Sequence, residues 1–223
     1  MVNRPKVLVS WSTGKDAAYA LWLLKQRDDV EIAGLLTTIR EPAATVTMHE
    51  VGLDLLKAQA DATGFPLRTL HLPWPCPNEQ YARIMGEAMT EARAEGIEAV
   101  VFGDVFLEDV RRYREESLAR VGMRALFPLW GRPTAALVRE MLQSGLRARI
   151  ACVDTTKLPA SYAGRELDES LLAELPETID PCGEYGELHS FVWDGPMFRQ
   201  PVAVEMRGVV QEGGFARAEL HLR

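Results

Sequence analysis

The residues with the clearest chemical potential lie in a short polar run that follows an apolar run near the N-terminus. Residues 6–11 (KVLVSW) are typical of a strand buried on both faces, and residues 12–16 (STGKD) follow directly. Gly14 lets the backbone turn tightly, and the amides that open the next helix carry the positive end of its dipole. The run therefore predicts an anion site in which Lys15 supplies a cation and Asp16 a carboxylate able to hold Mg²⁺ through water.

Two other interpretations of this run have to be weighed. The widespread phosphate loop needs a glycine five residues before Gly14 and Ser or Thr after the lysine, but Val9 and Asp16 stand at those positions. That motif is excluded. The other interpretation is a helix start capped by the hydroxyl of Ser12 or Thr13 beside an incidental lysine. On the residues alone it stays open.

A second polar cluster lies near the end of the chain. Glu184, Glu187 and His189 fall within six residues, and Gly183 and Gly186 indicate a bent loop that could bring their side chains together. Two carboxylates and an imidazole could bind ammonia or an amine, or move its proton, since the ordinary pKa of histidine lies near neutrality. The alternative is a solvated turn that enters a strand, with His189 merely packed.

The elements that would position these residues alternate along the first half of the chain. Strand patterns cover 6–11, 32–39, 67–72 and 98–102, and helical patterns cover 16–26, 50–63 and 78–95. Such alternation predicts right-handed βαβ units and a parallel sheet, whose ligands bind beyond the carboxyl ends of the strands. Candidate nucleotide contacts gather at those ends: Ser10, Ser12, Thr13, Gly14, Lys15, Asp16, Thr38, Gly103 and Asp104.

The second half has a different character. It predicts helices over 134–144 and 168–175, and strands over 148–153, 202–206 and 217–220, with a Gly213-Gly214 turn before the last strand. The fold class is therefore α/β, with a parallel-sheet domain over 1–130 and a smaller α+β, substrate-binding domain over 131–223.

Three further candidates have structural alternatives. Met48, just before a helix, could line an adenine pocket, although the neighbouring His49 is more typical of a structural helix start. Gly103 and Asp104 could contact the nucleotide or form a simple turn. A nucleophilic role for Cys182 is weakly supported, because no second cysteine lies close in sequence.

The basic cluster over 111–114 has an electrostatic alternative to phosphate binding. Arg111 with Glu115, and Arg112 with Glu116, make i,i+4 pairs on one helix, which favours a solvated, ion-paired face that includes Arg114.

Composition narrows the classes of function. The chain has 223 residues, 47% of them hydrophobic, with a net charge of −7. An acidic chain disfavours a nucleic-acid partner, and the absence of an 18-residue apolar run disfavours a membrane span. Three cysteines without a Cys-x-x-Cys pair, and no signal-peptide pattern, indicate a cytoplasmic location.

At this point a family resemblance adds to the analysis. Residues 12–17 resemble the Ser-Gly-Gly-Lys-Asp-Ser signature of the PP-loop ATP pyrophosphatases, and 183–190 is similar to the Gly-Glu-Asn-Gly-Glu-Phe-His-Thr run of their diphthine–ammonia ligase-like branch. Further matching segments are 103–105, 128–130, 153–155, 164–167 and 180–182. The chain departs from the pattern at Thr13, Ala17, Tyr185, Leu188 and Ser190.

The resemblance implies a fold and a reaction. The fold would be Rossmann-type, like the adenine nucleotide alpha hydrolases. The reaction would be ATP-dependent amide synthesis, in which a carboxylate is adenylated with loss of pyrophosphate and then attacked by ammonia or an amine, releasing AMP. The implied cofactors are ATP and Mg²⁺, with Asp16 as metal ligand. The implied catalytic residues are Lys15, Asp16, Glu184, Glu187 and His189.

The resemblance also bears on partners and alternatives. In eukaryotes and archaea the family acts on diphthine of translation elongation factor 2, so the acceptor would be a small-molecule or protein-borne carboxylate. Two alternatives are a tRNA-modifying PP-loop enzyme and a sensor that binds ATP or AMP without turnover. A homodimer is retained as a further hypothesis.

Overall fold

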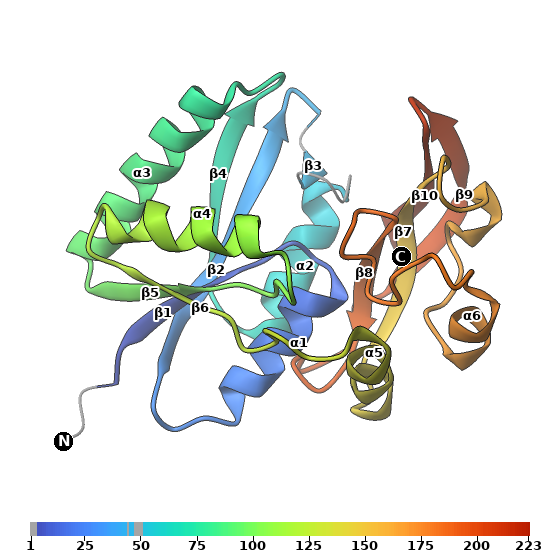
Figure 1. Ribbon diagram of the computed structural model, residues 1–223, viewed down its shortest axis with the longest axis horizontal. Helices are drawn as coiled ribbons and strands as arrows, with labels where there is room; N and C mark the ends of the chain where they lie inside the picture. The colour runs from blue at the N-terminus through green and yellow to red at the C-terminus, as the bar shows by residue number, and fades with distance from the viewer. Residues whose placement is uncertain (1–3, 44, 47–50) are drawn as a thin grey trace.

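A mostly parallel sheet organises the first half of the chain (Figure 1). The computed structural model describes residues 4–43, 45–46 and 51–223. The sheet contains β1 (Lys6–Ser10), β2 (Glu31–Glu41), β3 (Thr45–Val46), β4 (Leu67–Pro73), β5 (Ile97–Val101) and β6 (Arg124–Leu126). Strand β1 lies between β2 and β5, β4 pairs with β2, and β6 with β5, all in parallel; β3 is antiparallel to β2. The strand order therefore reverses between β1 and β5, where such sheets bind ligands.

Helices cover both faces of this sheet. They are α1 (Lys15–Lys25), α2 (Leu53–Thr63), α3 (Asn78–Ala94) and α4 (Glu108–Ala119). Successive side chains of a strand point to opposite faces. Val7 and Val9 accordingly belong to the core under α1 and α2, whereas Leu8 packs with Met89 and Leu118 from α3 and α4. Both faces of β1 are buried, as its continuous apolar run predicts.

The second half forms an antiparallel sheet beside the first. Its strands are β7 (Arg147–Asp154), β8 (Leu188–Asp194), β9 (Val204–Glu212) and β10 (Phe215–Leu222), in the order β8-β7-β10-β9. The remaining elements are α5 (Thr134–Gln143), the 3₁₀ helix η1 (Ala160–Tyr162) and α6 (Glu169–Glu174). Gly213 and Gly214 turn the chain between β9 and β10 with φ of 58° and 82°, a conformation that glycine adopts without strain.

The predicted fold class is confirmed, and the differences are local. Strand β2 is longer than its hydrophobic pattern, and α2 starts at Leu53 rather than at residue 50, which lies outside the described residues. Strands β3 and β6 were not predicted, because two or three residues carry too little periodicity to recognise. The domain boundary after residue 130 stays a prediction. Within the described ranges, no helix combines the length and the apolar character needed to cross a membrane.

A buried glutamine joins the loop after β1 to the second sheet. Gln59 of α2 accepts a hydrogen bond from Trp11 Nε1 (2.9 Å) and donates from Nε2 to the carbonyls of Thr13 (3.0 Å) and Val192 (2.6 Å). The Val192 amide also donates to the Thr13 carbonyl (3.0 Å). Since Gln59 is fully buried, these bonds have no competition from water, and they fix β8 against the loop.

We expect Gln59→Leu to lower the free energy of unfolding by about 2–4 kcal/mol, because it leaves a buried N–H and a buried carbonyl unpaired. Chemical denaturation measures the change. The matched control is Gln26→Leu on the exposed end of α1, which we expect to stay within about 0.5 kcal/mol of the unchanged protein. Equal effects of the two substitutions would contradict the assigned role of Gln59.

Candidate functional site

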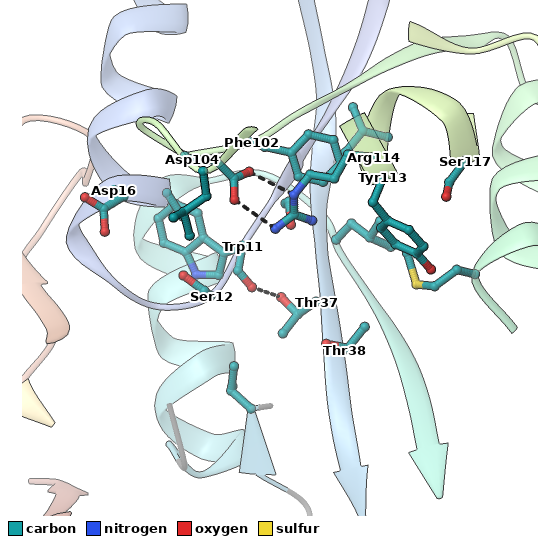
Figure 2. Close-up of a pocket in the computed structure, with 18 of the residues that line it drawn as sticks. Trp11, Ser12, Asp16, Thr37, Thr38, Phe102, Asp104, Tyr113, Arg114 and Ser117 are labelled. Carbon is teal, nitrogen blue, oxygen red and sulfur yellow. Dashed lines mark hydrogen bonds and ion pairs between the residues drawn. The ribbon is translucent and has the colours of Figure 1, made fainter. Parts of the chain in front are cut away.

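A cavity of about 680 Å³ opens at the carboxyl ends of the parallel strands (Figure 2). Its walls come from the loop after β1, the end of β2, the loop after β5, helices α3 and α4, and the segment 182–190. Gly103 allows the loop after β5 to approach the start of α1 closely. A Cβ at this position would lie 2.8 Å from the backbone carbon of Asp16 and 2.9 Å from the amide nitrogen of Ala17. Only glycine therefore fits between the loop and the start of α1.

The loop after β1 has a strained backbone at one position. Thr13 has φ of 71°, in the left-handed region that a β-branched residue rarely adopts. Its side chain is fully buried, and its hydroxyl has no hydrogen-bond partner among the described residues. The following residue, Gly14, is extended and precedes the first turn of α1. The glycine of the family signature suits this position because it carries no Cβ.

Lys15 joins this loop to the second half of the chain. Its ammonium is buried, with an exposed fraction of 2%, and donates to Asp16 Oδ2 (2.8 Å) and to the carbonyl of Cys182 (2.5 Å). Its amide donates to Ser190 Oγ (3.1 Å). Burial is the largest single influence and would lower the pKa of Lys15, but Asp16, Cys182 and Glu184 together outweigh it, and the pKa is raised. The ammonium stays charged at every physiological pH.

Two carboxyl groups near Lys15 have raised pKa values. Burial raises the pKa of Asp16 although Lys15 opposes it, and Asp16 Oδ1 has no hydrogen-bond partner in the described part of the chain. Glu184 accepts a hydrogen bond from the amide of Val105 (3.1 Å). Burial, and then the charge of Asp16, raise the pKa of Glu184 to about 7. Glu184 can thus take up or release a proton near neutral pH.

The other two members of the second cluster differ from expectation. Burial, together with the positive charge of Lys15, lowers the pKa of His189 to about 4, so the expected near-neutral value was wrong and the imidazole is neutral. Glu187 accepts hydrogen bonds from the amides of Tyr185 (2.9 Å) and Asp180 (3.3 Å). It lies outside the set of described residues that line the cavity. Its position is that of a residue that holds the loop.

The cavity brings together most of the candidates expected from the sequence. The candidates on its wall are Ser10, Ser12, Lys15, Asp16, Thr38, Gly103, Asp104, Glu184 and His189. Thr13 and Gly14 lie in the loop behind the wall, and Met48 is outside the described residues together with His49. The roles of all these residues stay predictions.

The structure also corrects the interpretation of Arg114 and agrees with the weak support for Cys182 as a nucleophile. Arg111 pairs with Glu115 (2.8 Å) as expected, but Arg114 lines the cavity and pairs with Asp104 (2.8 Å). The pair joins a loop to a helix, so no helical spacing could predict it. Burial raises the pKa of Cys182 to about 12, which leaves its thiol protonated and unsuited to nucleophilic attack.

Comparison with known proteins identifies the family of this chain. A model described as the diphthamide synthase N-terminal domain matches residues 5–125, and one described as the diphthamide synthase C-terminal domain matches residues 133–217. The chain belongs to the diphthamide synthase family. Members of this family use ATP, and the cavity at the start of α1 lies where the nucleotide is expected.

Diphthamide synthase relatives match most of the chain. The diphthine–ammonia ligase of Homo sapiens is 30% identical over 77% of this chain and 73% of its own length. That of Danio rerio is 27% identical over 75% and 67%, and that of Mus musculus is 34% identical over 56% and 48%. These matches confirm the predicted ATP-dependent ligase that forms an amide bond, and they do not favour a tRNA-modifying enzyme or a sensor.

We expect Thr13→Gly to have a free energy of unfolding about 1 kcal/mol higher than that of Thr13→Ala, because alanine keeps the Cβ that strains the left-handed backbone. Chemical denaturation of the two variants measures the difference. Both substitutions remove the unpartnered hydroxyl, so their comparison isolates the backbone term. At an ordinary φ the order is reversed, since glycine loses more backbone entropy on folding. An alanine variant as stable as the glycine variant would show that the left-handed conformation carries no strain.

Proposed function

We propose that the chain activates a protein-borne carboxylate with ATP and converts it to an amide with ammonia, and that the acceptor is diphthine or a carboxylate of the same kind. One observation carries the proposal. The buried Lys15 ammonium and Asp16, at the start of α1, share a cavity wall with Glu184 of the segment 182–190. A site for phosphate and a site for proton transfer thus open into the same space.

In the first step, a carboxylate oxygen of the acceptor attacks the α-phosphorus of ATP. The bond from this phosphorus to the oxygen that bridges to the β-phosphorus breaks, and the electron pair leaves with pyrophosphate. The first amides of α1, the Ser12 hydroxyl and the Lys15 ammonium would stabilise the charge on the leaving group. The product is an acyl-adenylate.

Mg²⁺ would accompany the phosphates. The Asp16 Oδ1 atom is buried without a hydrogen-bond partner among the described residues, which suits a ligand that faces a cation directly or through water. No cluster of three or more His, Cys, Asp or Glu side chains occurs in the described ranges that could hold a metal ion alone. Mg²⁺ commonly binds through one or two carboxylates and the substrate's phosphates, so the residues fit the ion.

In the second step, ammonia attacks the acyl carbon and the bond to the AMP oxygen breaks. The nitrogen must lose a proton, and Glu184 is the acceptor whose pKa, at about 7, suits transfer near neutral pH. His189 is neutral and can orient ammonia by a hydrogen bond without holding a charge. The adenylate must be kept from water, which would hydrolyse it.

Two finer proposals concern location and assembly. The cysteines Cys76, Cys152 and Cys182 form no disulfide among the described residues, which is typical of a reducing compartment such as the cytoplasm. The homodimer stays a prediction.

We expect Lys15→Met to lower the rate of pyrophosphate release by about 10²–10³-fold, because it removes the cation at the leaving group. The assay contains ATP, Mg²⁺, ammonium and elongation factor 2 that carries diphthine. Lys25→Met is the matched control, since Lys25 lies at the other end of α1 and donates to the Met197 carbonyl (3.0 Å). Circular dichroism checks that both variants fold. A protein that releases no AMP with this acceptor would refute the proposed substrate.

We expect Glu184→Gln to retain ATP–pyrophosphate exchange with the acceptor but to slow amide formation. The ratio of unchanged-protein to variant rates should rise with pH and level off above about 7, because only the deprotonated carboxylate accepts a proton. Taking this ratio cancels the greater fraction of free ammonia at high pH. Glu177→Gln, on the exposed surface, is the control. A ratio independent of pH would exclude Glu184 as the base.

A further inference from the structure

Arg114 is a cavity residue that the proposed mechanism does not use. Its guanidinium reaches from α4 over the ring of Phe102, 4.2 Å from the centroid, to the carboxylate of Asp104 in the loop after β5. Figure 2 shows this ion pair above Thr37, with Asp104 on the side toward Asp16. A cation therefore stands over the strand ends, next to the path of a nucleotide that begins at Asp16.

A triphosphate needs more positive charge than Lys15 supplies. Among the described residues, the arginines and lysines that line the cavity are Lys15, Arg114 and Arg120, and His189 is neutral. Lys15 is buried and already bound to Asp16 and to a carbonyl. Arg120 follows the last residue of α4, beyond the helix that carries Arg114. Arg114 is thus the cation placed to meet a phosphate beside the strand ends.

The ion pair of Arg114 with Asp104 has a geometry that allows another anion to replace the carboxylate. Arg114 Nε lies 2.8 Å from Asp104 Oδ2, yet neither atom makes an aligned hydrogen bond within the described part of the chain. A second contact, from an Nη atom of Arg114 to Asp104 Oδ1, is long at 3.2 Å. The Arg114 and Asp104 side chains are 30% and 14% exposed, so the pair is only partly buried. A phosphate oxygen can replace the carboxylate, because it can accept aligned, charge-assisted hydrogen bonds that Asp104 does not accept from Arg114 Nε.

We propose that Arg114 leaves Asp104 when the nucleotide binds and that its guanidinium binds the α-phosphate, the group that remains in the acyl-adenylate and in AMP. This inference rests on the proposed use of ATP. Asp104 acts as the holder of Arg114 before the nucleotide arrives, and its carboxylate is then free to face Mg²⁺. Arg114 is accordingly a nucleotide-binding residue, in contrast to its neighbour Arg111.

The experiment compares the binding of ATP, AMP and adenosine by isothermal titration calorimetry in the presence of Mg²⁺. We expect Arg114→Gln to weaken the binding of ATP and of AMP by a similar factor of about 10- to 100-fold, because both carry the α-phosphate. The affinity for adenosine should stay unchanged. Arg114→Lys keeps the charge but loses the two-pronged geometry, so its affinities for ATP and AMP should lie between those of Arg114→Gln and of the unchanged protein. Arg111→Gln is the matched control, since Arg111 pairs with Glu115 and stacks on Trp130.

Three outcomes would overturn the inference. If Arg114→Gln weakens the binding of adenosine as much as that of ATP, Arg114 only supports the shape of the cavity. If the substitution weakens the binding of ATP but not that of AMP, Arg114 binds the leaving phosphates instead. If ATP binds Arg114→Gln as well as it binds the unchanged protein, Arg114 has no part in nucleotide binding, although the proposed function stands. Failure of the unchanged protein to bind ATP would refute the proposed function together with the inference.

Discussion

A buried ammonium must find negative charge or carbonyl dipoles within the protein, because its transfer from water is otherwise very unfavourable. Lys15 meets this requirement with the carboxylate of its own neighbour, Asp16, and with a carbonyl from Cys182, 167 residues further along the chain. The second contact draws the segment 182–190 onto the start of α1. The loop after β1 and the segment 182–190, which both line the cavity, are consequently held together by this contact.

The same low-polarity environment divides the titratable groups by role. Burial raises the pKa of Glu184 to about 7 and lowers that of His189 to about 4, since in both cases it disfavours the charged form. The charge of Asp16 raises the pKa of Glu184 further, against a smaller opposing effect of Lys15, and the charge of Lys15 lowers the pKa of His189 further. A carboxylate that titrates near neutral pH therefore stands beside an imidazole that does not, the reverse of what their ordinary pKa values suggest.

Precision at this site comes from the backbone around it. Gly103 lets the loop after β5 touch the first turn of α1, and Gln59 holds the loop after β1 against Val192 of β8. The strained Thr13 is tolerated because these contacts over-determine its conformation. A glycine at this position would adopt the same conformation without strain.

The sequence by itself predicted most of the longer elements and placed the polar loop after β1 at a strand end. Buried strands such as β1 carry continuous apolar runs, and Gly14, Lys15 and Asp16 follow one of them at a strand end, so topology alone assigns them to the ligand-binding edge. Only the tertiary structure decided which distant groups meet them. The ion pair of Arg114 with Asp104, the buried position of Glu187 away from the cavity wall and the low pKa of His189 depend on packing between elements and on burial. Local periodicity in the sequence cannot predict such packing or burial. A shifted pKa or an ion pair depends on groups that are close in space although they are far apart in the sequence.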